Sequence, residues 1–333
     1  MSTLSVETRE LTFGQAINEA LAEEMRRDER VFVIGEDVAE AGTPFKVLSG
    51  LVEEFGPARV LDSPISEAGI TGLGVGAAMT GLRPVVDIMF GDFLTLVMDQ
   101  LVNQAAKVHY MSGGKLKVPL VVRTTLGATR RSAAQHSQSL QAWVSHIPGL
   151  KVAIPSTPSD AKGLLKTAIR DDNPVVFIED KLHYQLKGEV PAGEYTIPLG
   201  VADVKRPGDD VTIVATSSMV QASLAAAELL ESEGISAEVV DPRTTTPLDE
   251  ETIVRSVEKT GRAIVVDEGH RRYGVTAEIA AVIAERAFYH LDAPVRRLGA
   301  LDVPVPFSPP LEDVTVATPE TIAHAARELV GKG

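Results

Sequence analysis

Val31-Phe32-Val33-Ile34-Gly35 is the stretch of this chain that decides the fold. The run is short, continuous and apolar, and it therefore predicts a strand that is buried on both faces. Strands of this kind belong to parallel sheets that helices cover on both sides. The run indicates an α/β fold.

Helices and strands are expected to alternate on both sides of this run. Thr12 and Gln15 have the spacing of a capping box and predict a helix that extends to about Arg27. Further along, helices are expected at 67–80, 94–111 and 158–170, and strands at 84–89, 118–125, 152–154 and 175–179. Strands that alternate with helices imply a mostly parallel sheet with helices on both faces.

A stretch rich in proline and glycine, residues 191–209, interrupts the alternation and is expected to be a linker. The linker would separate a first domain, residues 1–190, from a second domain, residues 210–333. In the second domain, strands are expected at 211–215, 237–241 and 263–267, and helices at 219–233, 249–260, 275–287 and 319–329. The sequence thus predicts two α/β domains with mostly parallel sheets.

The composition is typical of a globular protein and disfavours a nucleic-acid partner. The 333 residues suffice for two domains, and the net charge of −14 disfavours phosphate binding. The absence of cysteine excludes disulfides, thiolate nucleophiles and cysteine-based metal sites. The N-terminus lacks the pattern of a signal peptide, and no apolar run is long enough to span a membrane. We therefore expect a cytoplasmic protein.

Glu67 is the first candidate for chemistry. It is expected in the first turn of a helix, where the helix dipole stabilises a carboxylate, so a purely structural role is one interpretation. Ile65 and Phe93 could provide an apolar lining, and burial there would favour the protonated carboxyl group. A carboxyl group poised between its two forms is suited to proton transfer.

His136 is the second candidate, on an expected loop among three uncharged polar residues. Histidines on loops are commonly solvated, but these neighbours make a proton donor or acceptor an equal interpretation. Arg130 and Arg131, on the same loop, are typical of solvated side chains.

Signatures of other active sites are missing from the sequence. There is no G-x-S-x-G run, and His109 and His146 lack metal-ligand spacing. The glycines at 72, 74 and 76 fall inside an expected helix and do not have the dinucleotide-binding spacing. With no metal or phosphate motif to complete it, the site around Glu67 looks like half of an active site.

Seven short runs, in order along the chain, are similar to those of one enzyme family. They are SPISEAG at 63–69, TGLRP at 80–84, YMSGG at 110–114, AQHSQS at 134–139, PGLKV at 148–152, DAKGLL at 160–165 and LDAP at 291–294. On these runs the chain resembles the β subunit of the E1 component of thiamine-diphosphate-dependent 2-oxoacid and acetoin dehydrogenase complexes. The resemblance extends from about Leu11 to Val330. It implies a transketolase-like pyrimidine-binding domain followed by a transketolase C-terminal domain.

The resemblance also implies partners. The chain would be an oxidoreductase subunit that is active only with an α subunit, in a heterotetramer of two α and two β chains. The α subunit would hold the cofactor's diphosphate and Mg²⁺ through a Gly-Asp-Gly…Asn motif, which neither 91–93 nor 208–210 of this chain fits. The C-terminal domain would dock the subunit-binding domain of an E2 acyltransferase, whose lipoyl domain accepts the acyl unit. A charge of −14 is compatible with steering toward a basic docking domain.

Carried over by position, the family's site residues fall on the candidates already named. Glu67 would contact N1′ of the aminopyrimidine and donate a proton there, which prepares the cofactor to attack the substrate carbonyl. Phe93 would stack on the pyrimidine, and Ile65 would line it. His136 would face the substrate and assist acyl transfer to lipoamide.

The resemblance further implies a structural potassium ion, a hard cation that prefers oxygen ligands. The matching residues are Leu120, Ala168, Ile169, Asp171 and Asn173. The apolar members of this set would have to use their backbone carbonyls.

Acetoin, pyruvate and branched-chain 2-oxoacids remain alternative substrates. Runs at 122–125, 177–181, 195–200 and 303–309 favour the acetoin group, although they reflect lineage and do not build a pocket. A different class of function is a catalytically silent scaffold that links α to E2. Half of a split transketolase would need basic residues for a substrate phosphate, and only Arg130 and Arg131 are available.

Overall fold

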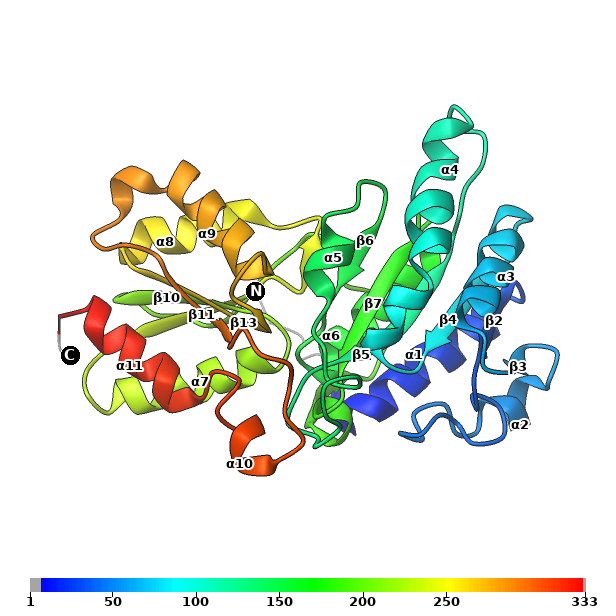
Figure 1. The fold of residues 1–333 in the computed structure, drawn as a ribbon, viewed down its shortest axis with the longest axis horizontal. Helices are drawn as coiled ribbons and strands as arrows, with labels where there is room; N and C mark the ends of the chain where they lie inside the picture. Colours follow the sequence, from blue (N-terminus) through cyan, green and yellow to red (C-terminus); the bar gives the residue numbers. More distant parts are fainter. Residues whose placement is uncertain (1–6, 332–333) are drawn as a thin grey trace. The chain divides into compact units, whose positions relative to one another are not determined.

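The computed structural model describes residues 7–331. By their contacts these residues form two compact units. The first contains the residues up to Thr125 together with Val144–Leu199, and the second contains Leu126–Trp143 together with the residues from Gly200 onward. Each unit is α/β, so the predicted fold class is confirmed (Figure 1). The boundaries at 190 and 210 stay predictions of the sequence.

A parallel sheet forms the centre of the first unit. Its strands in this unit lie in the order β6-β7-β5-β4-β2-β3. Their bounds are β2 (Val31–Gly35), β3 (Val60–Asp62), β4 (Arg83–Ile88), β5 (Val121–Leu126), β6 (Lys151–Ala153) and β7 (Val175–Asp180). β2 pairs in parallel with both β3 and β4, and every residue of β2 is buried, as its apolar run predicts. The carboxyl ends of β2 and β3 therefore meet at one edge of the sheet.

Helices of the first unit begin where the sequence places them. α1 (Phe13–Arg27) opens with the predicted capping box, in which Thr12 and Gln15 exchange backbone-to-side-chain hydrogen bonds. α1 packs against α6 (Pro158–Arg170), and both contribute to one apolar core. The remaining elements include α2 (Leu51–Phe55), α3 (Glu67–Met79), α5 (Gln141–Ser145), η3 (His183–Gln185) and the antiparallel pair β1 (Thr8–Thr12) and β8 (Lys187–Pro191).

The single helix predicted at 94–111 is wrong in its continuity. The structure has a 3₁₀ helix, η1 (Gly91–Leu96), a π-helix, η2 (Asp99–Ala105), and a short α-helix, α4 (Ala106–Met111). Apolar periodicity marks which face of a helix is buried but does not distinguish these hydrogen-bonding patterns, which differ by one residue in the span of each hydrogen bond. The prediction therefore found the segment and missed its internal changes.

Gly149 is a position at which both backbone and space require glycine. Its φ is +101°, and a Cβ built there would lie 2.1 Å from the carbonyl oxygen of Ala106 in α4. We expect Gly149→Ala to lower the free energy of unfolding by about 3 kcal/mol, measured by chemical denaturation. Gly81 is the matched control, because its φ is +102° but a Cβ would meet nothing within 4 Å. Gly81→Ala is expected to cost about 1–2 kcal/mol, and equal losses at the two sites would contradict the steric argument.

The second unit is built on a five-stranded sheet with the order β14-β13-β10-β11-β9. Its strands are β9 (Asp203–Arg206), β10 (Val211–Ala215), β11 (Ala237–Asp241), β13 (Ala263–His270) and β14 (Arg296–Ala300). The strand β9 lies within the predicted linker and pairs antiparallel with β11, whereas the β10–β11, β10–β13 and β13–β14 pairs are parallel. The sheet is therefore mostly parallel, as predicted.

Helices cover both faces of this second sheet (Figure 1). α7 (Ser218–Glu231) packs with α11 (Pro319–Leu329), and α8 (Glu250–Thr260) packs with α9 (Val275–Arg286). Alternate residues of β10 separate the two cores, since Ile213 belongs to the core with α7 and Val214 to the core with α8. The unit also contains η4 (Phe288–His290), α10 (Pro309–Glu312) and the short strand β12 (Thr244–Thr246).

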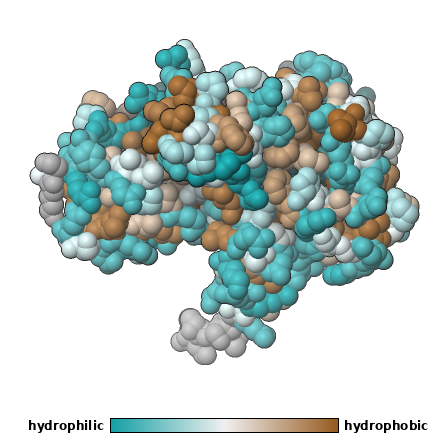
Figure 2. All heavy atoms as spheres, turned by 60° about the horizontal axis from the view of Figure 1, so that its bottom comes forward, coloured by the Kyte–Doolittle hydropathy of each residue, from teal (hydrophilic) through white to brown (hydrophobic). Residues whose placement is uncertain are grey.

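The surface carries apolar patches among mostly hydrophilic residues (Figure 2). In the first unit, exposed large apolar side chains include Tyr110 and Met111 of α4, and in the second they include Tyr289 and Phe307. Exposed apolar patches of this kind often mark contacts with other molecules. Over residues 7–331, we find no helix with the length and apolarity that crossing a membrane requires.

Candidate active site

Glu67 lies at the carboxyl edge of the first sheet, where α3 begins. The preceding loop is tied to the neighbouring strand, because the N–H and hydroxyl of Ser63 both donate to the carbonyl of Gly35, at 2.9 and 3.2 Å. Glu67 is only 8% exposed although it is the first residue of its helix. The sequence prediction of a buried carboxyl group at this helix start is confirmed.

Glu36 is a second carboxyl group at this edge, and the sequence reasoning missed it. It follows Gly35 directly, at the carboxyl end of β2. Burial raises the pKa of Glu36, and the negative charge of Glu67 raises it further. Its Oε1 is buried and accepts no hydrogen bond within residues 7–331. The signal that could have identified Glu36 is its place after a buried parallel strand, where functional side chains of open α/β sheets gather.

Ile65 and Phe93 are the two apolar residues that the sequence suggests for this site. Ile65 is 81% exposed, two residues before Glu67. Phe93 of η1 is half-buried, and its ring meets that of Phe90 edge-to-face at 5.9 Å. An exposed aliphatic chain, a supported aromatic ring and a buried carboxyl group are the contacts that a heteroaromatic ring with a basic nitrogen requires. The chemical character of these side chains is compatible with the pyrimidine of thiamine diphosphate, and their contact with it stays a prediction of the sequence.

His136 belongs to the second unit, in Leu126–Trp143. Its side chain is half-buried, and its backbone N–H donates to the carbonyl of Ala133 at 3.5 Å. The adjacent Arg131 is not simply solvated, because its guanidinium forms ion pairs with Glu312 and Asp313 at 2.8 and 2.7 Å. The expectation of a solvated Arg131 is wrong, since the carboxylates that hold it come from a segment distant in the sequence.

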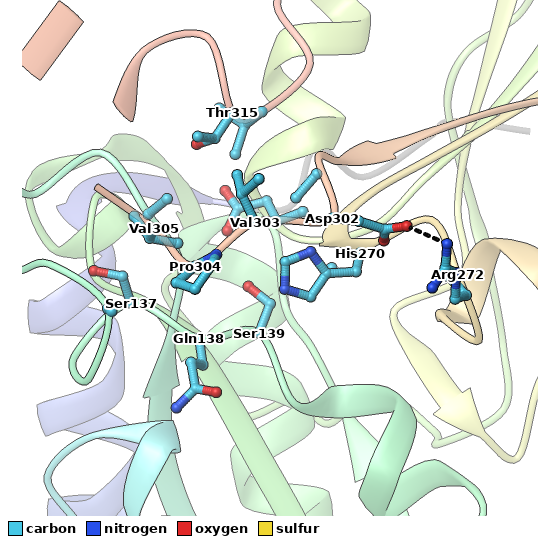
Figure 3. Close-up of a pocket in the computed structure, with 16 residues that line it drawn as sticks. Ser137, Gln138, Ser139, His270, Arg272, Asp302, Val303, Pro304, Val305 and Thr315 are labelled. Atoms are coloured by element: carbon cyan, nitrogen blue, oxygen red, sulfur yellow. Dashed lines mark ion pairs between the residues drawn. The ribbon is translucent and has the colours of Figure 1, made fainter. Parts of the chain in front are cut away.

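A cavity of about 400 Å³ lies beside the segment that follows His136. Figure 3 shows Ser137, Gln138 and Ser139 facing Val303 and Pro304 across it. Ser137 is buried, and its Oγ has no hydrogen-bond partner within residues 7–331. The His136 segment therefore borders open space that a substrate or another chain could enter.

The five residues expected to bind potassium lie around the end of α6. Asp171 accepts hydrogen bonds from Lys151 at 2.5 Å and from the Asn173 side chain at 2.8 Å. Burial alone would raise the pKa of Asp171, but these hydrogen bonds outweigh it and hold the pKa below its usual range. A guanidinium nitrogen of Arg83 donates to the carbonyls of Ile169 and Asp171, at 3.0 Å each. Oxygen ligands suit a hard cation, and three of these oxygens already contact a cationic side chain.

The other two carbonyls of the set accept backbone hydrogen bonds. The carbonyl of Leu120 accepts the N–H of Val175 at 2.9 Å, and that of Ala168 accepts the N–H of Asp171 at 3.3 Å. Residues 7–331 contain no group of three or more histidine, cysteine, aspartate and glutamate side chains that could hold a metal ion. The apolar members of the predicted potassium set could contribute only their backbone oxygens.

Comparisons with known families match both halves of the chain. Residues 9–187 match the family described as "Transketolase, pyrimidine binding domain", and residues 200–322 match "Transketolase, C-terminal domain". The first match includes Glu67, Phe93 and His136.

Curated relatives cover almost the whole chain. One is the β subunit of acetoin:2,6-dichlorophenolindophenol oxidoreductase from Bacillus subtilis, 52% identical over 97% of this chain and 98% of the relative. Another is the 2-oxoisovalerate dehydrogenase β subunit of the same organism, 47% identical over 96% of this chain and 98% of the relative. The mitochondrial pyruvate dehydrogenase E1 β subunit of Dictyostelium discoideum is 46% identical over 98% of this chain and 93% of the relative.

Solved structures agree with this fold. A split-gene transketolase aligns with a TM-score of 0.78 at 23% identity, over 96% of this chain and 98% of that one. A transketolase from Pichia stipitis aligns with a TM-score of 0.71 at 15% identity, over 96% of this chain and 46% of that one. At these identities the likeness shows the fold alone.

Proposed function

The chain belongs to the family of E1 β subunits of thiamine-diphosphate-dependent 2-oxoacid and acetoin dehydrogenases, and from this premise we propose that it serves an acetoin-cleaving complex. Subunits of this family are oxidoreductase components that pair with α subunits. The observation that carries the site assignment is the buried Glu67 at the carboxyl edge of the first sheet, beside Glu36.

In this proposal, the chain contributes the pyrimidine end of a shared site. Glu67 holds or donates a proton at the ring nitrogen, and Ile65 and Phe93 provide apolar contact. Burial of Glu36 beside Glu67 raises the pKa of the Glu36 carboxyl group, and the negative charge of Glu67 raises it further. Thiamine diphosphate, when bound, supplies the carbon nucleophile and the electron sink of the reaction. His136 passes a proton during acyl transfer to the lipoyl group.

Two metal ions belong to the proposal. Mg²⁺ is held with the diphosphate by the α subunit, since this chain lacks the Gly-Asp-Gly…Asn motif. Potassium binds the oxygens of Leu120, Ala168, Ile169, Asp171 and Asn173. The carbonyls that Arg83 contacts have a second lone pair, so they can accept both the guanidinium and a cation.

Acetoin is the substrate we propose, with branched-chain 2-oxoacids and pyruvate as alternatives. The relative named for acetoin shares 52% of its residues with this chain, against 47% and 46% for those named for 2-oxoisovalerate and pyruvate. This difference in identity is consistent with the runs at 122–125, 177–181, 195–200 and 303–309, which resemble the acetoin group. The same lineage suggests that the C-terminal domain docks the E2 acyltransferase, toward which a net charge of −14 would steer a basic domain.

Reconstitution with the α subunit tests the substrate. We expect acetoin to give the highest kcat/KM, by about 10-fold or more over pyruvate and 2-oxoisovalerate, because a pocket discriminates by about 1–3 kcal/mol for each misfitting group. The measurement is thiamine-dependent turnover on the three compounds, with the isolated β chain as the control. A preference for either oxoacid would refute the choice of acetoin, and full activity of the isolated chain would refute the shared site.

A further inference from the structure

His136 lies on a segment whose backbone is held in an unusual conformation. Within Leu126–Trp143, Thr129, Arg131 and Ala133 have φ values of 72°, 60° and 58°. Residues other than glycine adopt this left-handed region at a cost in free energy, and they keep it only where surrounding contacts impose it. Three such residues at alternate positions before His136 indicate that the rest of the unit shapes the segment.

The first contact that shapes the segment is Glu312, the last residue of α10. Its side chain is fully buried. One carboxylate oxygen accepts the N–H of Thr129 at 2.6 Å, and the other accepts the N–H and Nη1 of Arg131 at 3.2 and 2.8 Å. The carboxylate thus fixes two of the three left-handed residues by their backbone. The guanidinium of Arg131 supplies the counter-charge that a buried anion requires.

The second contact that shapes the segment is Asp267, near the end of β13. It holds Gln141, which follows His136 in the sequence, whereas Glu312 holds residues that precede His136. Gln141 donates Nε2 to both carboxylate oxygens of Asp267, at 2.9 and 2.8 Å. The N–H of Gly269 and the hydroxyl of Thr216 also donate to this carboxylate. Burial raises the pKa of Asp267, and these hydrogen bonds oppose the rise.

The segment approaches this strand end closely. A Cβ at Gly269 would lie 2.7 Å from Oδ2 of Asp267 and 3.2 Å from Nε2 of Gln141. The carboxyl ends of the neighbouring strands β10 and β13 are the point at which the strand order of the second sheet reverses. The helices that follow these two strands belong to the cores on opposite faces of the sheet. Open α/β sheets bind ligands at such a point. In this chain, Gln141 of the His136 segment binds to Asp267 at that point of the sheet.

We propose that Glu312 and Asp267 are positioning residues for His136, through which the C-terminal domain takes part in acyl transfer. His136 is five residues from Arg131 and five from Gln141, midway between the two anchored positions. A segment fixed on both sides restricts where its middle residue can move. A misplacement of about 1 Å in an active site can cost on the order of 100-fold in rate. The proposal rests on the role of His136 proposed above.

The test uses the enzyme reconstituted with its α subunit and compares two acceptors. One is a lipoyl group, and the other is a redox dye that takes electrons without acyl transfer. Glu312→Gln and Asp267→Asn are each expected to lower kcat with the lipoyl acceptor by about 10- to 100-fold, with KM unchanged. Dye reduction is expected to stay within about two-fold, because the site around Glu67 is left intact. A structural loss of active protein would lower both rates equally.

Asp313→Asn is the matched control. Asp313 is exposed and pairs with the same guanidinium at 2.7 Å, so the variant removes one negative charge beside Arg131 without touching Glu312. Exposed ion pairs contribute little, and acyl transfer is expected to stay within about two-fold. Gln141→Met is a second variant in case the carboxylate variants fail to fold. Methionine is similar in size to glutamine and leaves Glu312 and Asp267 in place, but it cannot donate the hydrogen bonds from Gln141 to Asp267. It too is expected to lower acyl transfer selectively.

His136→Ala separates the two ways in which the proposal can fail. If His136→Ala leaves acyl transfer unchanged, the proposed role of His136 is wrong, and the positioning proposal is wrong with it. If His136→Ala lowers acyl transfer but Glu312→Gln, Asp267→Asn and Gln141→Met do not, only the positioning proposal is wrong. Equal loss of both reactions in all three anchor variants would also overturn it.

Discussion

Glu67→Gln is expected to lower the turnover of the reconstituted enzyme by about 10³-fold. Glutamine keeps the size and the hydrogen-bonding reach of the side chain but cannot release or take up a proton. General acid–base catalysis contributes about 10²- to 10⁴-fold, so losing the proton at the site removes most of the rate. Steady-state turnover with saturating cofactor and substrate measures the effect.

The fold should survive this change. Glu67 is at the first position of α3, where loss of a favourable charge–dipole contact costs about 0.3–1 kcal/mol, and denaturation curves would show this. Glu251→Gln is the matched control, since Glu251 is an exposed carboxylate in the first turn of α8. Turnover of Glu67→Gln within about two-fold of the control would contradict the site assignment. Such tolerance is what a catalytically silent scaffold would show.

The parts of the fold that the sequence predicts are those with local signals. The helix α6 has the bounds expected from sequence, because Thr157 caps it and Pro158 opens it. The strand β2 follows from its own apolar run. By contrast, β9 lies in a stretch that reads as a linker, and it becomes a strand by pairing with β11. Pairing partners of this kind are decided by tertiary contacts that local composition does not contain.

The candidate site also has residues that the sequence could identify and residues that it could not. Glu67 could be found from its place at a helix start, and the family resemblance gave it a role. Glu36 could not be singled out by composition, because what distinguishes it is burial beside Glu67. The grouping of Leu126–Trp143 with the second unit was also missed. Hydrogen bonds join this segment to Glu312 and Asp267, which lie more than 100 residues away in the sequence.

The largest effect on stability is expected at Arg123, which lies between two carboxylates inside the first unit. Its guanidinium makes a two-pronged contact with Glu179 at 2.6 and 2.7 Å and also bonds to Asp87. All three side chains are buried, and Tyr184 donates its hydroxyl to Glu179 at 2.9 Å. Burial raises the pKa of Asp87 and of Glu179, and Arg123 opposes both rises. The arginine is thus the counter-charge for two buried carboxylates.

Arg123→Met is expected to lower the free energy of unfolding by about 3–5 kcal/mol at pH 7, measured by chemical denaturation. Methionine fills part of the space but leaves both carboxylates without their cation. Arg26→Met is the matched control, because Arg26 makes a similar two-pronged contact with Glu54, at 2.6 Å for each bond, on the exposed surface. The control is expected to cost less than about 1 kcal/mol. Equal losses would show that burial of the Arg123 cluster does not matter.

The loss should also depend on pH, with a definite sign. Without Arg123, burial acts unopposed and moves the pKa values of Asp87 and Glu179 further above their unfolded values of about 4. A carboxyl group whose folded-state pKa is raised favours the folded state most below its unfolded pKa, and this advantage is lost as pH rises through the folded pKa. The difference between Arg123→Met and the parent chain should therefore be largest at pH 7 and shrink toward about pH 4. A deficit that stays the same from pH 7 to pH 4 would mean that the two carboxyl groups do not titrate in the variant and that lost packing is its cause.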